Sequence, residues 1–269
     1  MTFYLGTSGY HYDSWVHTFY PAGNADFLSY YAKYFNSVEI NSTFYRIFPP
    51  DFFMKMTARV PPNFKFFIKV NQNITHVQDR TVNDDIRAFN ASLKQMVKTP
   101  YYGGILLQFP FSFKYNKDSM KYLDKLVTHL PVKQAVEFRH HSWNNELVLK
   151  YCSEKSVSVV NVDIPPVDEL FPPLELVTSD MIYFRMHGRA AEKWWNYREP
   201  HERYDYYYSE EEIRGIKDRI EKSVKDKPGA EVYIFFNNHY QAKAVKNALQ
   251  LGNSLGILKN NPTIQESLF

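Results

Sequence analysis

Short apolar runs alternate along the chain with longer segments in which apolar residues recur at helical spacing. The runs with strand character cover residues 3–8, 37–41, 65–70, 104–109, 135–140, 158–163, 181–187 and 232–237. Several of the segments between them open with Asn, Asp or Ser followed by acidic residues, as helix N-termini prefer. The interval after the second run is short, and the interval after the sixth contains too much proline for a regular helix.

Eight strands that alternate with helices predict a parallel arrangement in which right-handed crossovers join successive strands. Eight is also the number of strands that closes a barrel, and barrels of this class commonly use about 250 residues as one unit. The pattern therefore predicts the α/β class and a single (β/α)8 TIM barrel, with imperfect helices after strands 2 and 6. We expect residues 1–252 to form this domain and residues 253–269 to form a C-terminal tail.

The composition supports a large folded core. Of the 269 residues, 44% are hydrophobic and 17% aromatic, which excludes global disorder. The single cysteine, Cys152, excludes a disulfide framework and is expected in the core. The chain opens without a signal-peptide pattern and has no apolar run of about 18 residues, so we expect a soluble, cytoplasmic protein with no membrane partner. The net charge of +3, from 32 basic and 29 acidic residues, neither favours nor excludes nucleic acid.

Polar side chains gather near the ends of the predicted strands. In QAVEFRHHSW (134–143), Glu137 and Arg139 face the side of the strand opposite to Val136 and Phe138. Other strands repeat the pattern with Glu39, Asn41, Lys69, Gln108, Asn161, Asp163, Arg185, His187 and Asn237. We expect them to converge at the carboxyl ends of the strands, where active sites of this fold lie. The alternative is a structural network of three cations and three anions, although burying so many charges is usually no more stabilising than an apolar core.

An ordered set of motifs carries a family resemblance. They are GTSGY (6–10) with Trp15 and FYP (19–21), VEINSTFYR (38–46), ITH (74–76), LLQFP (106–110), VEFRHHSW (136–143), VDIP (162–165), RMHGR (185–189) and FNNH (236–239). Together they resemble the YecE-like domain-of-unknown-function family. The resemblance implies a TIM barrel and brings no established reaction. Tyr10 stands where many relatives have tryptophan.

Carboxylates beside arginines suit an anionic substrate, and phosphate is the anion expected first. We predict catalytic roles for Glu39, Glu137, Asp163 and His187. The predicted substrate-binding residues are Asn41, Lys69, Gln108, Arg139, Arg185, Arg189, Asn237 and His239. A divalent metal on the four catalytic candidates, with His76, His140 or His239 in reserve, is an alternative that three nearby cations oppose. The cofactor is therefore left unknown.

The connection after the seventh strand, GRAAEKWWNYREPHERYDYYYSEEE (188–212), is the longest in the chain. Its basic and aromatic residues are interleaved: Arg189, Lys193, Arg198 and Arg203 with Trp194, Trp195, Tyr197 and Tyr204. Such a mixture can stack bases and hold phosphates. Acidic residues dilute the charge, and the same tryptophans suit sugar rings or a structural lid. We keep both interpretations of this connection, nucleic-acid binding and a structural lid.

The chain ends in QESLF, where Gln265 precedes the pair Leu268 and Phe269 by three positions. This pentapeptide is similar to the bacterial sliding-clamp-binding motif. Ser267 matches that motif, whereas Glu266 stands where leucine is frequent. The resemblance implies a tail that orders on binding and lodges its Leu-Phe pair in a groove of the DNA sliding clamp. The alternative is a tail folded back on the main domain.

These features together predict a hydrolase or nuclease-like enzyme that acts on nucleic acid or another phosphodiester and is recruited to DNA by its tail. In this hypothesis Glu137 and Asp163 do acid–base work while Arg139 and Arg185 hold the phosphate. A glycosidase-like hydrolase with paired carboxylates is the strongest competitor. A non-catalytic binding module, whose polar residues are only structural, is the third candidate.

Overall fold

The computed structural model describes residues 1–225 and 227–258 of the chain. Within these residues, nine β-strands, all paired in parallel, form two sheets. The four-stranded sheet has the order β1 (Thr2–Thr7), β9 (Glu231–Phe236), β8 (Met181–Met186) and β7 (Asn161–Asp163). The five-stranded sheet has the order β2 (Ser37–Ile40), β3 (Lys65–Lys69), β4 (Tyr102–Gln108), β5 (Gln134–Glu137) and β6 (Ser158–Val159). The chain is therefore of the α/β class with parallel strands.

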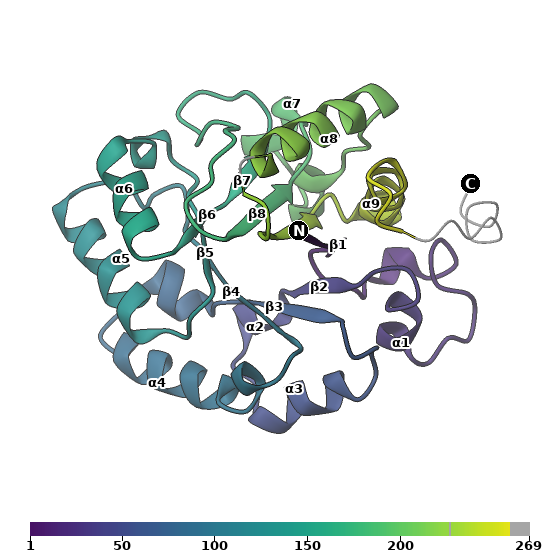
Figure 1. Ribbon diagram of the computed structural model, residues 1–269, viewed down its shortest axis with the longest axis horizontal. Coiled ribbons are helices and arrows are strands. Elements are labelled where there is room, and N and C mark those ends of the chain that lie inside the picture. Colours follow the sequence, from purple (N-terminus) through teal and green to yellow (C-terminus); the bar gives the residue numbers. More distant parts are fainter. Residues whose placement is uncertain (226, 259–269) are drawn as a thin grey trace.

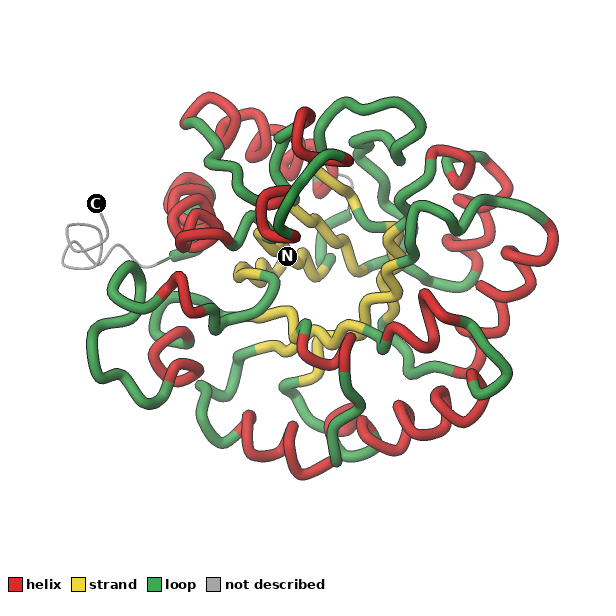
Figure 2. Tube along the Cα trace, turned by 180° about the vertical axis from the view of Figure 1, so that it is seen from behind, coloured by secondary structure: helices red, strands yellow, loops and turns green. Residues whose placement is uncertain are grey.

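Helices lie around the strands on the outside of the molecule (Figures 1 and 2). They are α1 (Phe27–Tyr31), α2 (Ser42–Tyr45), α3 (Pro50–Thr57), α4 (Val82–Leu93), α5 (Lys117–His129), α6 (Glu146–Glu154), α7 (Ala191–Trp195), α8 (Glu210–Val224) and α9 (Lys243–Ser254). Short helical turns occupy the loops: η1 (Asp13–Trp15), η2 (Asn73–Val77), η3 (Met96–Lys98), η4 (His141–Trp143), η5 (Pro200–Tyr204) and η6 (Tyr240–Ala242). Side chains at two predicted starts do cap their helices. Asn116 accepts from two backbone N–H groups of α5, and Ser209 forms a capping box with Glu212 on α8.

The single closed (β/α)8 TIM barrel predicted from the sequence is wrong, because the backbone ladder is interrupted at two places. The first interruption lies in residues 158–163, which form two strands instead of one. β6 pairs with β5 of the five-stranded sheet, whereas β7 pairs with β8 of the four-stranded sheet. Val160 lies between them, with its N–H donating to the carbonyl of Val136.

The second interruption separates β1 from β2. The side-chain amide of Asn36 stands between these strands, accepting from the N–H of Leu5 at 2.8 Å and donating to the carbonyl of Phe3 at 2.9 Å. One isolated backbone bridge, between Ser8 and Glu39, follows at the carboxyl ends. A side chain therefore satisfies backbone groups that a continuous sheet would pair with each other.

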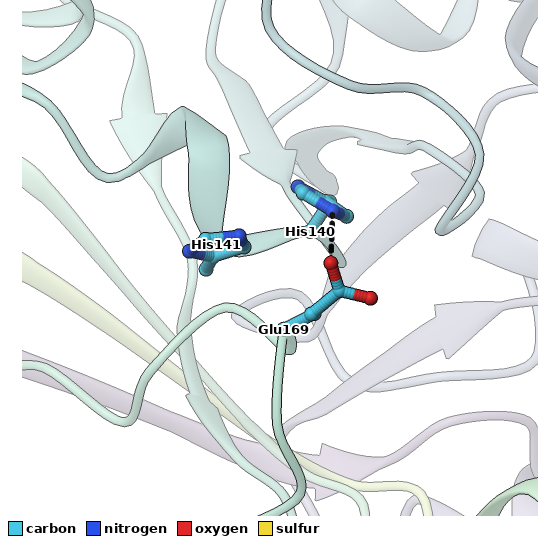
Figure 3. Close-up of side chains that lie close together, drawn as sticks. All are labelled: His140, His141 and Glu169. Carbon is cyan, nitrogen blue, oxygen red and sulfur yellow. Dashed lines mark ion pairs between the residues drawn. The ribbon is translucent and has the colours of Figure 1, made fainter.

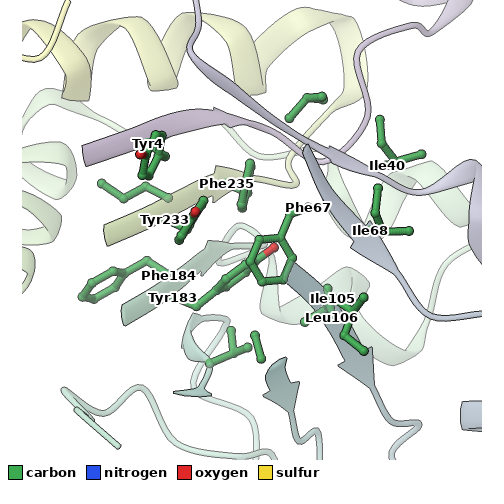
Figure 4. Packing of buried hydrophobic residues seen from close by; sticks show 14 of the residues in the cluster. Tyr4, Ile40, Phe67, Ile68, Ile105, Leu106, Tyr183, Phe184, Tyr233 and Phe235 are labelled. Carbon is green, nitrogen blue, oxygen red and sulfur yellow. The ribbon is translucent and has the colours of Figure 1, made fainter. Parts of the chain in front are cut away.

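Aromatic side chains fill the space between the two sheets (Figure 4). Phe67 of β3 packs against Tyr183 of β8 and Tyr233 of β9, with ring centroids 4.6 and 5.2 Å apart. Tyr233 also stacks on Tyr4 of β1 at 4.7 Å. Large rings bury much apolar area in specific geometries. Side-chain packing thus joins the two sheets where no continuous backbone ladder does.

Cys152 is buried in α6, as predicted, and burial raises the pKa of its thiol to about 12, which makes it a poor nucleophile. In residues 1–225 and 227–258, no helix combines the length and apolar character needed to cross a bilayer.

Candidate functional site

A cavity of about 660 Å³ opens at the carboxyl ends of the strands. Its walls come from the loop after β1, from α2, from the ends of β3 and β4, and from the loops around residues 201–204 and 237–239. Six of the eight predicted substrate-binding residues line it: Asn41, Lys69, Gln108, Arg185, Asn237 and His239. The predicted convergence of these side chains on one site is therefore seen, while Arg139 and Arg189 lie outside the lining.

The guanidinium of Arg185 forms part of the cavity wall. Behind the wall it binds the carboxylates of Glu39 and Glu137. It makes a bidentate pair with Glu39, at 3.0 Å from Nε and 2.7 Å from Nη2, and its Nη1 lies 2.9 Å from Glu137. Arg139 contacts the other oxygen of Glu137 through Nε at 2.7 Å. Both glutamates are fully buried. Their charges are therefore neutralised by the two arginines.

The protonation states of Glu137 and His187 follow from their burial and from the charges around them. Burial alone would raise the pKa of Glu137, but Arg139, Arg185 and His187 together lower it well below its ordinary value. Burial and the charge of Arg139 lower the pKa of His187 to about 3, so its ring is neutral at pH 7. Asn237 lies 2.9 Å from Nδ1 of His187, and Nε2 faces Glu137 at 3.3 Å. A carboxylate whose pKa is lowered in this way suits a counter-ion better than a general acid or base.

Asp163 lies in a separate cluster and does not meet Glu137. Its carboxylate accepts from Arg189 at 2.9 and 2.8 Å, from Arg219 at 2.9 Å and from the hydroxyl of Tyr208 at 2.9 Å. In the β7–β8 ladder Val162 pairs with Arg185, so Asp163 faces the opposite side of the sheet, toward α8. The β5–β6 register gives the same result, because Ser158 pairs with Ala135, which shares a face with Glu137, so that plain alternation turns Asp163 away from that face. The expectation that Asp163 would face the same interior as Glu137 is therefore wrong.

Arg219 was missed by sequence reasoning, although a signal for it exists. Glu212, Ile216 and Arg219 follow one another at helical spacing on α8, and Ile216 is buried. Polar residues on the buried stripe of a helix need partners inside the protein. Here Glu212 pairs with Arg189 at 3.1 Å, next to the contact between Arg219 and Asp163.

Lys69 differs from the other charged residues of the site. Its ammonium group lies 4.1 Å from the centre of the Phe44 ring, and it makes no ion pair or hydrogen bond with any residue that the structure describes. Burial, followed by the charge of Arg185, lowers the pKa of Lys69 to about 7, although Glu39 and Glu137 oppose the shift. The cavity therefore contains a cation that has no protein counter-ion.

Aromatic rings form much of the remaining wall, and sequence reasoning assigned a role to only two of them. They are Tyr10, Tyr12, Phe44, Tyr45, Tyr204, His201 and His239, of which His239 was predicted to bind substrate and Tyr204 to belong to a connection that can stack bases. His239 stacks on Tyr12 with ring centroids 4.3 Å apart. Burial and His201 lower the pKa of His239 to about 4. Several of these rings lie in the few residues that follow a strand end, and that position was the available signal.

The long connection after β8 packs over the strand ends through α7 and η5. Trp194 is buried and lies 5.5 Å from the guanidinium of Arg139. Trp195 is half exposed and contacts Phe111 edge-on at 4.8 Å. Arg203 lies 4.4 Å from the centre of the Tyr197 ring. Trp194 therefore covers the ion pair of Arg139 with Glu137, and Trp195 is open to solvent.

Gln265, Leu268 and Phe269, the predicted partner-binding residues, lie outside the described part of the chain.

We expect Glu137→Gln to lower the free energy of unfolding by about 3–5 kcal/mol, because two buried guanidinium groups would lose one of two counter-ions. Urea denaturation followed by circular dichroism measures this change. The control is Glu154→Gln, which breaks an exposed pair with Lys150 and should cost less than about 0.5 kcal/mol. A Glu137→Gln protein as stable as the parent would contradict the structural role of this carboxylate.

Comparisons with known proteins agree with this architecture. The chain is 28% identical over 272 residues to the UPF0759 protein YunF of Bacillus subtilis, covering 92% of this chain and 93% of that protein. A DUF72 family protein of Thermotoga maritima has a similar structure, with 35% identity, a TM-score of 0.86, and coverage of 95% of this chain and 100% of that one. A DUF72 family protein of Enterococcus faecalis has 26% identity and a TM-score of 0.85, with coverage of 96% and 97%. The family model described as "Protein of unknown function DUF72" matches residues 4–267, and the chain therefore belongs to the DUF72 family.

Proposed function

We propose that the protein is a phosphodiester hydrolase that binds a nucleotide or a strand of nucleic acid in the strand-end cavity. The observation that carries this proposal is the ammonium group of Lys69, which projects into an aromatic-walled cavity without a protein counter-ion. The rings offer surfaces on which bases stack, and the cation offers a contact for phosphate.

The charge of the cavity wall favours an anionic ligand. The described residues that line it include Lys69 and Arg185 but no aspartate or glutamate. Glu39 and Glu137 lie behind Arg185 and neutralise it, so the uncompensated charge at the wall is that of Lys69. A phosphate at this position would supply the missing counter-ion and would raise the pKa of Lys69.

In this proposal Lys69 stabilises negative charge on the phosphoryl group during transfer. His239 is neutral at pH 7 and lines the same cavity, so it can accept a proton from the water that attacks phosphorus. The P–O ester bond to the leaving oxygen breaks as the new P–O bond forms, and the leaving oxygen takes a proton from solvent. A bound phosphate raises the pKa of His239, which makes it a better base in the complex than in the free protein. Glu39 and Glu137 act by holding Arg185 in place.

A second candidate, a non-catalytic binding module, is favoured by the complete pairing of Glu39, Glu137 and Arg185. The same pairing argues against a glycosidase-like reaction, which needs one carboxyl group to donate a proton and a second to act as base or nucleophile. Turnover distinguishes the phosphodiester hydrolase from the binding module, because a binding module retains nucleotide affinity without cleaving any substrate.

The proposal is tested by fluorescence anisotropy with labelled single-stranded, duplex and abasic-site DNA. Titrations at several salt concentrations, with EDTA and with Mg²⁺ or Mn²⁺, are followed by a cleavage assay on the tightest ligand. We expect affinity that falls as salt rises, since phosphate contacts release counter-ions. Absence of binding to every DNA at low salt would overturn the proposal for DNA.

We expect Lys69→Met to weaken binding of the best phosphate ligand about 10- to 100-fold, the loss that follows from removing a charged hydrogen bond. In the parent protein, affinity should be highest below pH 7 and should fall as Lys69 loses its proton around that pH. Titrations from pH 5.5 to 9 measure both effects. The Lys69→Met variant should lose this pH dependence and should be no less stable than the parent, because burying its charge is costly.

The matched control is Lys65→Met, at the opposite end of the same strand, where the ammonium contacts the carbonyl of Pro100. Equal affinity loss in both variants would show that general surface charge, and not the cavity, attracts the ligand.

Recruitment to the DNA sliding clamp is proposed from the terminal QESLF alone. Replacing Leu268 and Phe269 by alanine should abolish clamp binding measured by surface plasmon resonance with the full chain, because the two apolar side chains supply most of the buried area. Thr263→Ala serves as the control within the same tail. Clamp affinity that survives the double replacement, or that is absent in the parent, would disprove the motif.

A further inference from the structure

Three side chains with metal-ligating atoms meet beside the end of β5 (Figure 3). His140 and His141 lie just beyond the strand end, after Phe138 and Arg139, and Glu169 belongs to the proline-containing connection after β7. One imidazole nitrogen from each histidine and one carboxylate oxygen of Glu169 all lie within 4.8 Å of one another. None of the three residues lines the strand-end cavity, so this cluster is separate from the site proposed above.

The backbone holds the two segments together. The N–H of His141 donates to the carbonyl of Glu169 at 2.8 Å, and the N–H of Phe171 donates to the carbonyl of Arg139 at 2.9 Å. An isolated antiparallel bridge joins His140 to Leu170 between these hydrogen bonds. Glu169 has a φ of +64°, a conformation that residues other than glycine adopt uncommonly and that often occurs at functional sites. The relative positions of the three ligating side chains are thus set by backbone pairing.

His140 provides the observation that points to a ligand. The side chain is almost completely buried, and its Nε2 has no hydrogen-bond partner among the described residues. The nearest carboxylate oxygen, from Glu169, is 3.9 Å away, which is too long for a hydrogen bond but short enough for both atoms to reach one ion. A buried nitrogen without a partner is costly unless something binds it.

The second ring nitrogen of His140, Nδ1, has a hydrogen-bond partner of the kind that metal-ligating histidines use. Nδ1 lies 2.9 Å from the hydroxyl of Ser142, which accepts a hydrogen bond from the N–H of Tyr115. When Nε2 binds an ion, the ring proton resides on Nδ1 and is donated to this hydroxyl. The 3.1 Å contact from the N–H of Ser142 to Nδ1, which suits the other tautomer, is then given up. Metal-ligating histidines commonly donate their second ring N–H in this way.

We propose that His140, His141 and Glu169 form a binding site for a divalent first-row transition metal, with Zn²⁺ as the preferred ion. Two imidazoles and one carboxylate favour zinc over Mg²⁺ and Ca²⁺, which prefer sets of oxygen ligands. Three protein ligands leave at least one coordination position for water or substrate, as in catalytic zinc sites. The His140 ring lies 4.9 Å from that of Phe111, which contacts the exposed Trp195. The ion would therefore lie beside the aromatic rim of the strand ends.

The test uses the full-length, tag-free protein after treatment with EDTA. Co²⁺ is added as a spectroscopic probe, and Zn²⁺ is then titrated against it in competition. We expect one equivalent of Co²⁺ to give visible d–d absorption, and Zn²⁺ but not excess Mg²⁺ to displace it. His141→Ala and Glu169→Gln should each weaken Zn²⁺ binding at least tenfold.

Both variants change exposed side chains, so folding is expected to survive, and circular dichroism confirms it. His129→Ala, at the exposed end of α5, controls for nonspecific histidine binding and should leave Zn²⁺ affinity unchanged. The proposal is overturned if the parent binds no Co²⁺ or Zn²⁺, or if His141→Ala and Glu169→Gln bind Zn²⁺ as tightly as the parent.

Discussion

The buried guanidinium of Arg185 connects the two sheets, because the two carboxylates that it binds belong to the sheet opposite its own. Arg185 belongs to β8 of the four-stranded sheet, whereas Glu39 lies in β2 and Glu137 in β5 of the five-stranded sheet. The backbone ladder between these sheets is interrupted at both of their meeting points, so this ion cluster spans a junction that hydrogen-bonded strands do not close. Tyr183, two residues before Arg185, donates its hydroxyl to Glu39 and packs on Phe67, which connects the ion cluster to the aromatic core beneath it. The geometry at the strand ends depends on these few contacts.

The same cluster determines the electrostatics of the cavity. Two arginines and two glutamates balance each other, and the neutral ring of His187 adds no charge. Lys69 is then the cation left over at the wall. An unbalanced charge in a partly dry space is costly for the free protein and strengthens its interaction with an incoming anion. Stability and ligand recognition therefore make opposite demands on this one side chain.

Much of this could be read from the sequence, because it depends on local pattern. Alternating apolar positions locate the strand segments, and Asn and Ser at helix starts do cap their helices. The polar residues at strand ends do gather around one cavity. The interruption at Val160 was not predictable in this way, since it depends on which neighbouring strand each half of the segment meets. This interruption is one of the two that leave the barrel open, whereas the outward face of Asp163 follows from plain alternation once Ser158 is paired with Ala135. The cluster of His140, His141 and Glu169 was also inaccessible, because Glu169 reaches the histidines only through pairing between distant segments.

The pairing of β1 with β9 has a consequence for biosynthesis. Thr2 stands opposite Glu231, so the first strand of the described residues pairs with the last, which is synthesised much later. The five-stranded sheet uses consecutive strands from Ser37 to Val159, and all of its partners are available as soon as that stretch has emerged. The four-stranded sheet must wait until residue 236 has been synthesised. During that interval the apolar residues of β1 lack their strand partner, and exposed apolar strands of this kind favour aggregation of the nascent chain.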